Sequence, residues 1–312
     1  MSHTVKPEVE VCESEIHRSE LYEKCNKNPG HLNFISPETF NLDCLPSVYR
    51  DQEVLNFVNA LSDLTVLISL NVTSESRPKF YPNTKVPFPY YDVRGGNRLR
   101  FGTGQIWMVK KKQKKVAING GKGFGRFLNR RVSYGVITVV TAAHLVYDNA
   151  EAESVVSHLN YDSADEMLSD TASLQGVGIV GANATRDKCV LKCVTYDLAL
   201  VDKLMTSFAK YKSLCRSVHA KYSQFRESKK LTVVVSHPHG QSKKISVGHW
   251  TKRHLMDEEN ENLTSYSYTA CTCPGSSGAP VYTFGGEGKW FLSTHLHMGV
   301  TDKGNQSCFC WE

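Results

Sequence analysis

Residues 275–280 read Gly275-Ser276-Ser277-Gly278-Ala279-Pro280 and place a serine between two glycines. A glycine on each side lets the backbone turn sharply and come close to a bound molecule, where a Cβ would clash. Such a turn can present a nucleophilic hydroxyl beside backbone N–H groups, or it can be an ordinary surface turn. The choice between these two interpretations depends on whether the rest of the chain offers partners for Ser277.

Two other segments offer such partners. Val139-Val140-Thr141-Ala142-Ala143-His144 is a β-branched run that ends in two small residues and a histidine, a setting that suits a general base on a rigid strand end. In Tyr196-Asp197-Leu198-Ala199-Leu200-Val201 an aspartate precedes an alternating apolar run, and its carboxylate can accept the second ring N–H of the histidine. We predict His144 as the base and Asp197 as its acid. Asp202 is the alternative acid, but it follows the apolar run.

The order of these three residues along the chain resembles that of the trypsin-like (chymotrypsin-clan) serine peptidases. In that family Thr-Ala-Ala-His, Asp-hydrophobe-Ala-Leu and Gly-x-Ser-Gly-x-Pro carry the catalytic residues, and all three motifs occur here in the same order. The resemblance covers about residues 60–312 and is closest to the glutamyl-endopeptidase-like, non-zymogen branch. It implies Ser277 as the nucleophile of an acyl-enzyme mechanism and the N–H groups of Gly275 and Ser277 as an oxyanion hole.

The same resemblance suggests how substrates would be selected. Thr272 lies five residues before Ser277, and His297 lies in a His-x-Gly strand. In glutamyl endopeptidases and picornaviral cysteine proteases, a Thr at that offset and a His in a His-x-Gly strand hold a Glu or Gln side chain, and a hydroxyl and an imidazole can bond a carboxylate or an amide. His295, two residues earlier on the same face, is the alternative. Ser276 replaces the aspartate of pancreatic-type members, so we expect a site that needs no zymogen activation.

The expected fold is all-β, with two antiparallel six-stranded β-barrels (chymotrypsin-like) and an N-terminal, partly helical extension. Residues 1–62 form the extension, which ends in a helix because apolar residues recur at helical spacing after Asp51. Strand-like runs follow, and no long helix is expected to interrupt them. We assign residues 63–205 to the first barrel, 206–229 to a connector and 230–312 to the second barrel.

Composition narrows the class of protein further. The chain has 312 residues, of which 40% are hydrophobic and 22% charged, as in ordinary globular proteins. No run approaches the roughly 20 apolar residues that cross a bilayer, and the start lacks a signal-peptide pattern. We therefore expect a cytoplasmic protein with no membrane partner. The resemblance to serine peptidases implies a polypeptide substrate and no cofactor. The sequence predicts no oligomeric state.

Positive charge is concentrated in residues 110–131, which hold nine basic residues and no acidic one. Such a segment could bind nucleic acid or another anionic partner, or it could be a solvated, glycine-rich hairpin. We favour the hairpin and expect no nucleic-acid partner. The alternative function is a catalytically idle protease-fold binding module that contacts anionic partners through this loop.

The ten cysteines are interpreted as free thiols, because no signal peptide directs the chain to an oxidising compartment. Two Cys-x-Cys pairs could nevertheless hold a zinc ion; they are Cys271, Cys273, Cys308 and Cys310. A Cys273–Cys308 disulfide, as some family members have near this position, is a further alternative. His237 and His239 lack a third ligand at suitable spacing, and we assign no metal site.

Overall fold

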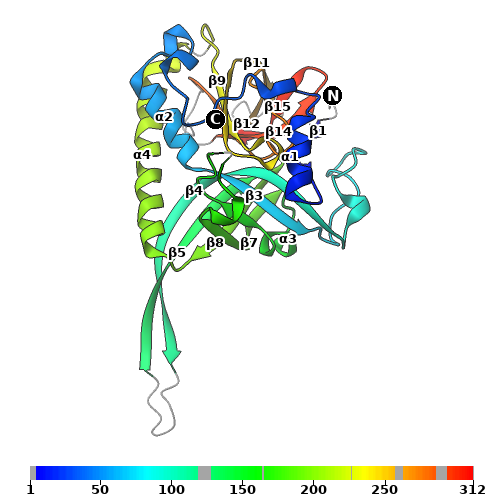
Figure 1. Cartoon of the computed structure of the whole chain (residues 1–312), viewed down its shortest axis with the longest axis vertical. Helices are drawn as coiled ribbons and strands as arrows, with labels where there is room; N and C mark the ends of the chain where they lie inside the picture. Colours follow the sequence, from blue (N-terminus) through cyan, green and yellow to red (C-terminus); the bar gives the residue numbers. More distant parts are fainter. Residues whose placement is uncertain are drawn as a thin grey trace.

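The computed structural model describes residues 5–118, 128–163, 165–225, 227–256, 263–285 and 294–311. The protein is mostly β-sheet with some helices, and its strands form two antiparallel sheets (Figure 1). One hydrophobic core joins both sheets to two of the helices, because Phe57, Ile106, Tyr211 and Val233 belong to the same buried cluster. The two sheets and these helices therefore pack as one body.

The first sheet contains seven strands in the order β2-β4-β3-β6-β7-β8-β5. β5, the last strand in this order, also pairs with β4, the second strand. The strands are β2 (Glu10–Val11), β3 (Thr65–Val72), β4 (Asn97–Ile118), β5 (Leu128–Thr141), β6 (Val156–His158), β7 (Ser173–Asn183) and β8 (Lys188–Thr195). β3 is apolar on both faces because both are covered: Val66, Leu67 and Ile68 are all fully buried.

The second sheet contains nine strands, seven of them in the order β10-β9-β13-β14-β15-β12-β11. β1 pairs with β14, and β16 pairs with β12. The strands are β1 (Lys6–Pro7), β9 (Thr232–Ser236), β10 (Lys244–Gly248), β11 (Trp250–Leu255), β12 (Leu263–Tyr268), β13 (Pro280–Thr283), β14 (His295–Thr301), β15 (Gly304–Ser307) and β16 (Cys310–Trp311). The N-terminal segment is thus part of both sheets, through β1 in one and β2 in the other.

Four α-helices accompany the sheets in the described part of the chain: α1 (Glu15–Glu23), α2 (Gln52–Asp63), α3 (Asn149–Glu153) and α4 (Leu198–Tyr222). Short 3₁₀ turns are η1 (Pro29–His31), η2 (Leu42–Cys44), η3 (Ser47–Tyr49), η4 (Tyr91–Val93), η5 (Leu168–Asp170), η6 (Ser223–Phe225) and η7 (Pro238–Gly240). α2 begins after Asp51, whose side chain accepts from the Glu53 N–H as an N-cap. α2 and α4 lie side by side along one flank of the molecule (Figure 1).

The long helix α4 corrects the expectation that no long helix interrupts the strands. The strand predicted to run to Val201 ends at Thr195, and α4 then occupies most of the expected connector. The buried side chains of α4 are spaced three, four or seven residues apart, which is a helical period; they are Val201, Leu204, Tyr211, Cys215, Val218 and Tyr222. The alternation at Leu198–Val201 was too short to distinguish a strand from the start of this helix.

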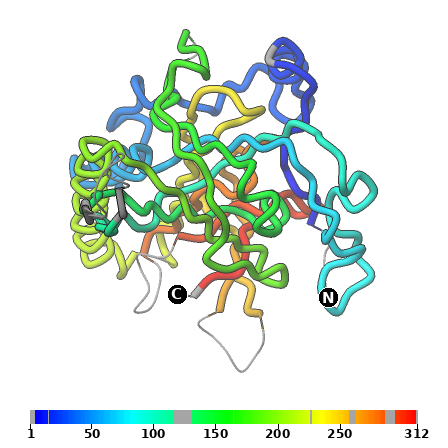
Figure 2. Tube along the Cα trace, turned by 90° about the horizontal axis from the view of Figure 1, so that it is seen from below, coloured from blue at the N-terminus to red at the C-terminus, as the bar shows by residue number. Residues whose placement is uncertain are grey.

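β4 and β5 continue beyond the body of the molecule as a long two-stranded arm (Figure 1). Seen from below, α4 lies at one edge of the molecule (Figure 2). Residues 110–118 and 128–131 of the basic segment lie in the arm. Two lysines there contact the region of α4: Lys111 pairs with Asp202, and Lys114 donates to the Tyr196 hydroxyl. The glycines expected in a hairpin turn between residues 120 and 125 lie outside the described residues.

Within the part of the chain that the structure describes, none of the helices has both the length and the apolar character needed to cross a membrane.

Candidate active site

Ser277 and His144 meet in the interior. Ser277 lies in the turn before β13, and His144 follows the end of β5. Ser277 Oγ is 2.8 Å from His144 Nε2, and both residues are fully buried. The small residues before His144 leave room for this approach, because Ala142 and Ala143 are themselves fully buried beside it. The structure thus brings together two of the three residues that the sequence proposed for catalysis.

The carboxylate that contacts His144 belongs to Asp187, which the sequence analysis did not select. Asp187 Oδ2 lies 2.6 Å from His144 Nδ1, and Oδ1 accepts from the His144 backbone N–H at 2.9 Å. Asp187 ends the turn between β7 and β8 with a φ of 53°, a left-handed conformation that Asp tolerates better than most residues. Two hydrogen bonds donated by His144 to one buried carboxylate fix both its backbone and its ring.

The prediction that Asp197 contacts His144 is wrong. Asp197 is the N-cap of α4, and its side chain accepts from the Leu200 N–H at 3.0 Å. The rival acid Asp202 lies on α4 in an exposed ion pair with Lys111. An aspartate before an apolar run is equally typical of a helix cap, and here the helical period of α4 decides the local structure.

A buried ion pair supports the backbone of His144 from the other side. Arg77 donates to the carbonyl oxygens of His144 and Leu145 at 3.0 and 3.2 Å. Its guanidinium also binds the Glu151 carboxylate with two hydrogen bonds of 2.5 and 2.6 Å. Both side chains are 0% exposed. No sequence pattern predicts this pair, because an arginine and a glutamate 74 positions apart look like ordinary surface residues.

The turn around Ser277 directs two backbone N–H groups at one point. Gly275 N and Ser277 N both donate to the Glu8 carbonyl oxygen, at 2.7 and 3.2 Å. Gly275 has a φ of 93°, and a Cβ at this position would lie 2.5 Å from the His237 carbonyl oxygen. Only glycine satisfies both conditions. The two predicted oxyanion-hole donors therefore converge, and their acceptor is a peptide carbonyl of the same chain.

The N-terminal segment runs between the two sheets past Ser277. Lys6 and Pro7 pair with Val300 and Gly299 of β14, and after Glu8 the chain pairs with β4. A Cβ on Gly299 would lie 2.1 Å from the Lys6 carbonyl oxygen, so only glycine permits this pairing. The Glu8 N–H donates to Ser277 Oγ at 3.0 Å. An extended peptide thus occupies both sides of the candidate nucleophile.

The Glu8 side chain lies in a pocket lined by the residues that the sequence proposed for substrate selection. Glu8 Oε2 accepts from Thr272 Oγ1 at 2.7 Å and from His297 Nε2 at 2.8 Å. Glu8 Oε1 accepts from Lys27 Nζ at 2.6 Å. Lys27 also donates to Asn305 Oδ1 at 2.8 Å, which holds the ammonium in place. Lys27 lies in the extension, where no sequence motif predicts a pocket residue.

His297 acts in this pocket as a neutral donor. Burial lowers the pKa of His297 and outweighs the opposing effect of Glu8. Burial also raises the pKa of Tyr268, which keeps its hydroxyl protonated. The Tyr268 hydroxyl lies 2.5 Å from His297 Nδ1 and donates to it, so the ring proton is on Nε2 and points at Glu8. The alternative residue His295 instead faces β12 and lies 3.0 Å from the Thr264 carbonyl oxygen.

The charge of Glu8 makes the docking of the N-terminal segment dependent on pH. Burial alone would raise the pKa of Glu8, but the hydrogen bonds from His297 and Lys27 and the positive charge of Lys27 prevail and lower the pKa from 4.5 to about 2. Because the pKa of Glu8 is lower in the docked state than in the unfolded chain, ionised Glu8 stabilises the docked state at pH values above 4.5. This stabilisation is lost as the pH falls toward about 2.

We expect this stabilisation to amount to about 3 kcal/mol. In chains carrying Ser277→Ala to prevent hydrolysis, the free energy of unfolding should fall more between pH 5 and pH 2 with Glu8 than with Glu8→Gln. Urea titrations of the two chains at each pH measure the difference. Parallel pH profiles would show that Glu8 is not held as an ionised group.

The two Cys-x-Cys pairs do not lie together, although their spacing suggested that they could form one site. None of the ten is joined in a disulfide, so the Cys273–Cys308 bridge considered from the sequence is not formed. Cys273 lies with Cys25, 3.5 Å between sulfurs, whereas Cys308 and Cys310 contact each other. The two Cys-x-Cys pairs therefore do not share one site.

Comparison with known families places this geometry in context. Residues 105–308 match the family described as the lysyl endopeptidase C-terminal domain, and this match covers more than half of the chain. The chain belongs to this family. The lysyl endopeptidase C-terminal domain family carries the trypsin-like serine protease fold, which agrees with the resemblance seen in the motifs. The narrower resemblance to the glutamyl-endopeptidase branch has no counterpart in the match.

Solved structures similar to this family member are proteases at low sequence identity. The HtrA-type protease AlgW with a tripeptide is 11% identical, with a TM-score of 0.41, and the match covers 81% of this chain and 58% of that chain. Deg5 is 11% identical with a TM-score of 0.39, covering 85% of this chain and 91% of Deg5. The active form of the Rv3671c protease from M. tuberculosis is also 11% identical, with a TM-score of 0.39, covering 85% and 82%. No curated protein matches the chain.

Proposed function

We propose that the protein is a serine endopeptidase that cleaves after glutamate, with Ser277, His144 and Asp187 as its catalytic residues. One observation carries the proposal: a peptide carbonyl, that of Glu8, accepts from the N–H groups of Gly275 and Ser277 while Ser277 Oγ contacts His144. This is the arrangement that acyl transfer requires, with a nucleophile, a base and an oxyanion hole around one carbonyl.

The residues divide the chemistry as follows. His144 Nε2 takes the Ser277 proton as Oγ attacks the carbonyl carbon, and Asp187 holds the ring and stabilises its positive charge. The N–H groups of Gly275 and Ser277 stabilise the negative oxygen that develops, each donor contributing about 3 kcal/mol. His144 then protonates the leaving amine, and water releases the acyl group by the same steps in reverse order.

The pocket favours an acidic side chain. Thr272, His297 and Lys27 all donate to the Glu8 carboxylate, and Lys27 supplies a positive charge. The family is named for lysyl endopeptidases, but a lysine in this pocket would place its ammonium beside that of Lys27. Donors without a carboxylate to bind would also be left unpaired, which is costly in a buried site. We therefore propose Glu, with Gln as the second choice.

A set of matched peptides tests this function. The chain should carry Glu8→Lys, so that its own segment no longer fills the pocket. Peptides that differ only before the scissile bond should then be cleaved in the order Glu, Gln, then Lys or Phe, with kcat/KM for Glu at least about 100-fold above that for Lys. The same chain with Ser277→Ala should cleave none of them. A preference for Lys would refute the pocket, and equal hydrolysis by the Ser277→Ala chain would refute the mechanism.

Lys27 is expected to set the preference for Glu over Gln. Lys27→Met removes a charged donor to the carboxylate, and we expect kcat/KM for Glu peptides to fall about 10- to 100-fold, with a smaller loss for Gln peptides. Lys24→Met is the matched control, because Lys24 is an exposed lysine in an ion pair with Glu20. Equal losses for Glu and Gln peptides, or equal losses in both variants, would contradict this role.

We also propose that the two sheets correspond to the two barrels of the fold, with residues 1–62 as the extension. In the first sheet, strands β3 to β8 pair in a closed order, which supports this proposal. The candidate site lies where the two sheets meet. If the chain binds Glu peptides without cutting them, the peptide experiment supports the alternative function, a catalytically idle binding module.

A further inference from the structure

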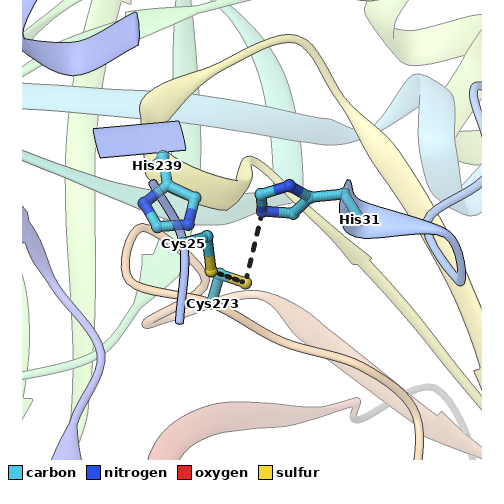
Figure 3. A group of neighbouring side chains, drawn as sticks. All are labelled: Cys25, His31, His239 and Cys273. Carbon is cyan, nitrogen blue, oxygen red and sulfur yellow. Dashed lines mark hydrogen bonds between the residues drawn. The ribbon is translucent and has the colours of Figure 1, made fainter. Parts of the chain in front are cut away.

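Four potential metal ligands meet beside the nucleophile turn, outside the catalytic residues (Figure 3). Cys25 and His31 come from the N-terminal extension, His239 from η7, and Cys273 lies four residues before Ser277. All four residues are buried, and their ligand atoms lie within 4.8 Å of one another. No other group of this kind occurs in the residues that the structure describes.

The distances between these atoms suit a tetrahedral zinc ion. Zinc binds sulfur at about 2.3 Å and nitrogen at about 2.1 Å, so the ligands of a tetrahedral site lie about 3.3 to 3.8 Å apart. The sulfurs of Cys25 and Cys273 are 3.5 Å apart, and Cys273 Sγ is 3.7 Å from His31 Nε2. Two thiols and two imidazoles form one of the usual ligand sets of structural zinc sites.

His239 provides a second, independent indication. Its Nδ1 lies 2.6 Å from Glu10 Oε2, whereas its buried Nε2 has no hydrogen-bond partner among the described residues outside this group of four, in which Cys25 is its neighbour. A carboxylate on one ring nitrogen is the usual support of a histidine that binds metal through the other. The His31 ring is also held in place, because it stacks on the Tyr22 ring with centroids 3.9 Å apart.

We propose that Cys25, His31, His239 and Cys273 bind one structural zinc ion. Four protein ligands leave no open position, so the ion supports the fold and takes no part in hydrolysis. It would join the N-terminal extension to the nucleophile turn. Since Glu10 supports His239 and lies two residues after Glu8, the same site would also help to hold the N-terminal segment in register with the pocket.

Metal analysis of the full chain tests the site. In the Ser277→Ala chain, purified without chelators, we expect about one zinc per chain, and replacement by Co²⁺ should give the absorption of a tetrahedral thiolate site. Cys25→Ser should weaken binding at least about tenfold, whereas Cys271→Ser should not. If Cys25→Ser does not fold, the cobalt spectrum of the parent chain decides. Absence of bound metal, equal loss in Cys271→Ser, or a Cys25–Cys273 disulfide found by mass spectrometry would overturn the proposal.

The position of Glu8 supports a second inference, which rests on the proposed function. The Glu8 carbonyl is the one that both oxyanion-hole donors bind, and its side chain fills the pocket. The chain continues on both sides, through β1 before Glu8 and β2 after it. The segment is therefore placed as a substrate across the site, with the bond between Glu8 and Val9 next to Ser277.

We infer that the protein cleaves its own chain between Glu8 and Val9. Ser277 Oγ would bond to the Glu8 carbonyl carbon, and its proton would pass through His144 to the Val9 nitrogen as that C–N bond breaks. Water would then release Glu8 as a carboxylate and restore the Ser277 hydroxyl. One peptide bond and one water give one carboxylate and one amine, and no other reactant is needed.

Intact-mass analysis of the full chain tests this reaction. The unaltered chain should lose residues 1–8 and start at Val9, and Glu13→Lys should behave in the same way. Ser277→Ala and Glu8→Lys should stay uncut at this bond. Ser277→Ala should also stay intact when mixed with active chain, because cleavage occurs within one molecule.

The outcomes separate this inference from the proposed function. An intact chain whose Glu8→Lys form still cuts Glu peptides would overturn self-cleavage and leave the endopeptidase proposal standing, with the segment as an inhibitor. A chain that cuts neither itself nor any peptide would refute the function itself. Cleavage at another bond, or equally fast cleavage of Ser277→Ala in the mixture, would overturn the inference.

Discussion

Asp187→Asn should lower kcat for a Glu peptide about 10⁴-fold with little change in KM, if Asp187 orients His144 as the geometry indicates. An asparagine keeps the shape of the side chain, but it cannot stabilise a positively charged ring, and its amide can force the wrong tautomer. Asp187 makes two hydrogen bonds to His144, one to the ring and one to the backbone. The loss should therefore appear in the chemical step.

Asp197→Asn is the matched control for this prediction. Asn caps helices about as well as Asp, so α4 should keep its start and kcat should stay within about twofold of the parent value. Both variants should be measured with the same peptide in the Glu8→Lys chain. A large loss in Asp197→Asn with none in Asp187→Asn would contradict the assignment of the acid.

Arg77→Met should destabilise the fold by about 3 to 5 kcal/mol, because it removes one partner of a fully buried ion pair. The Glu151 carboxylate would lose its two hydrogen bonds from the guanidinium. The carbonyl oxygens of His144 and Leu145 would lose their donor as well. Urea denaturation in the Ser277→Ala background measures the change without interference from hydrolysis.

Lys111→Met provides the comparison for Arg77→Met. It removes an equally charged partner from the exposed Lys111–Asp202 pair, and such pairs contribute less than about 1 kcal/mol. Similar small losses for both variants would show that Arg77 does not stabilise the segment that carries His144.

The sequence predicted those parts of the site that lie in short motifs. Ser277 and His144 stand at strand ends with small neighbours, and each motif specifies its own local geometry. Thr272 was found through its offset from Ser277 and His297 through its His-x-Gly strand, and both contact the Glu8 carboxylate. These predictions needed only local structure and one alignment of motifs.

The acid was missed because its motif was ambiguous. Asp187 and Asp197 both precede apolar runs, and both look like aspartates at the start of a strand. What distinguishes them is the turn before Asp187 and the helical period after Asp197, which extends over the whole of α4. A window of 25 residues would have shown that period, whereas the four residues after Asp197 did not.

The contributions of the extension could not be predicted from local patterns. Glu8, Lys27 and Cys25 lie in a region without apolar periodicity, and each contacts a partner at least 245 positions further along the chain. Nothing in the residues around them indicates that they enter a site. The pairing of β1 with β14 and of β2 with β4 brings the start of the extension to Ser277.

The central claim is that Ser277 is an activated nucleophile, and labelling with a fluorophosphonate probe tests it most directly. The probe should be applied to the Glu8→Lys chain, and the modified peptide identified by mass spectrometry. We predict a single adduct on Ser277, lost in Ser277→Ala and strongly slowed in His144→Ala. Labelling that persists in Ser277→Ala, or its absence from every form of the chain, would contradict the account.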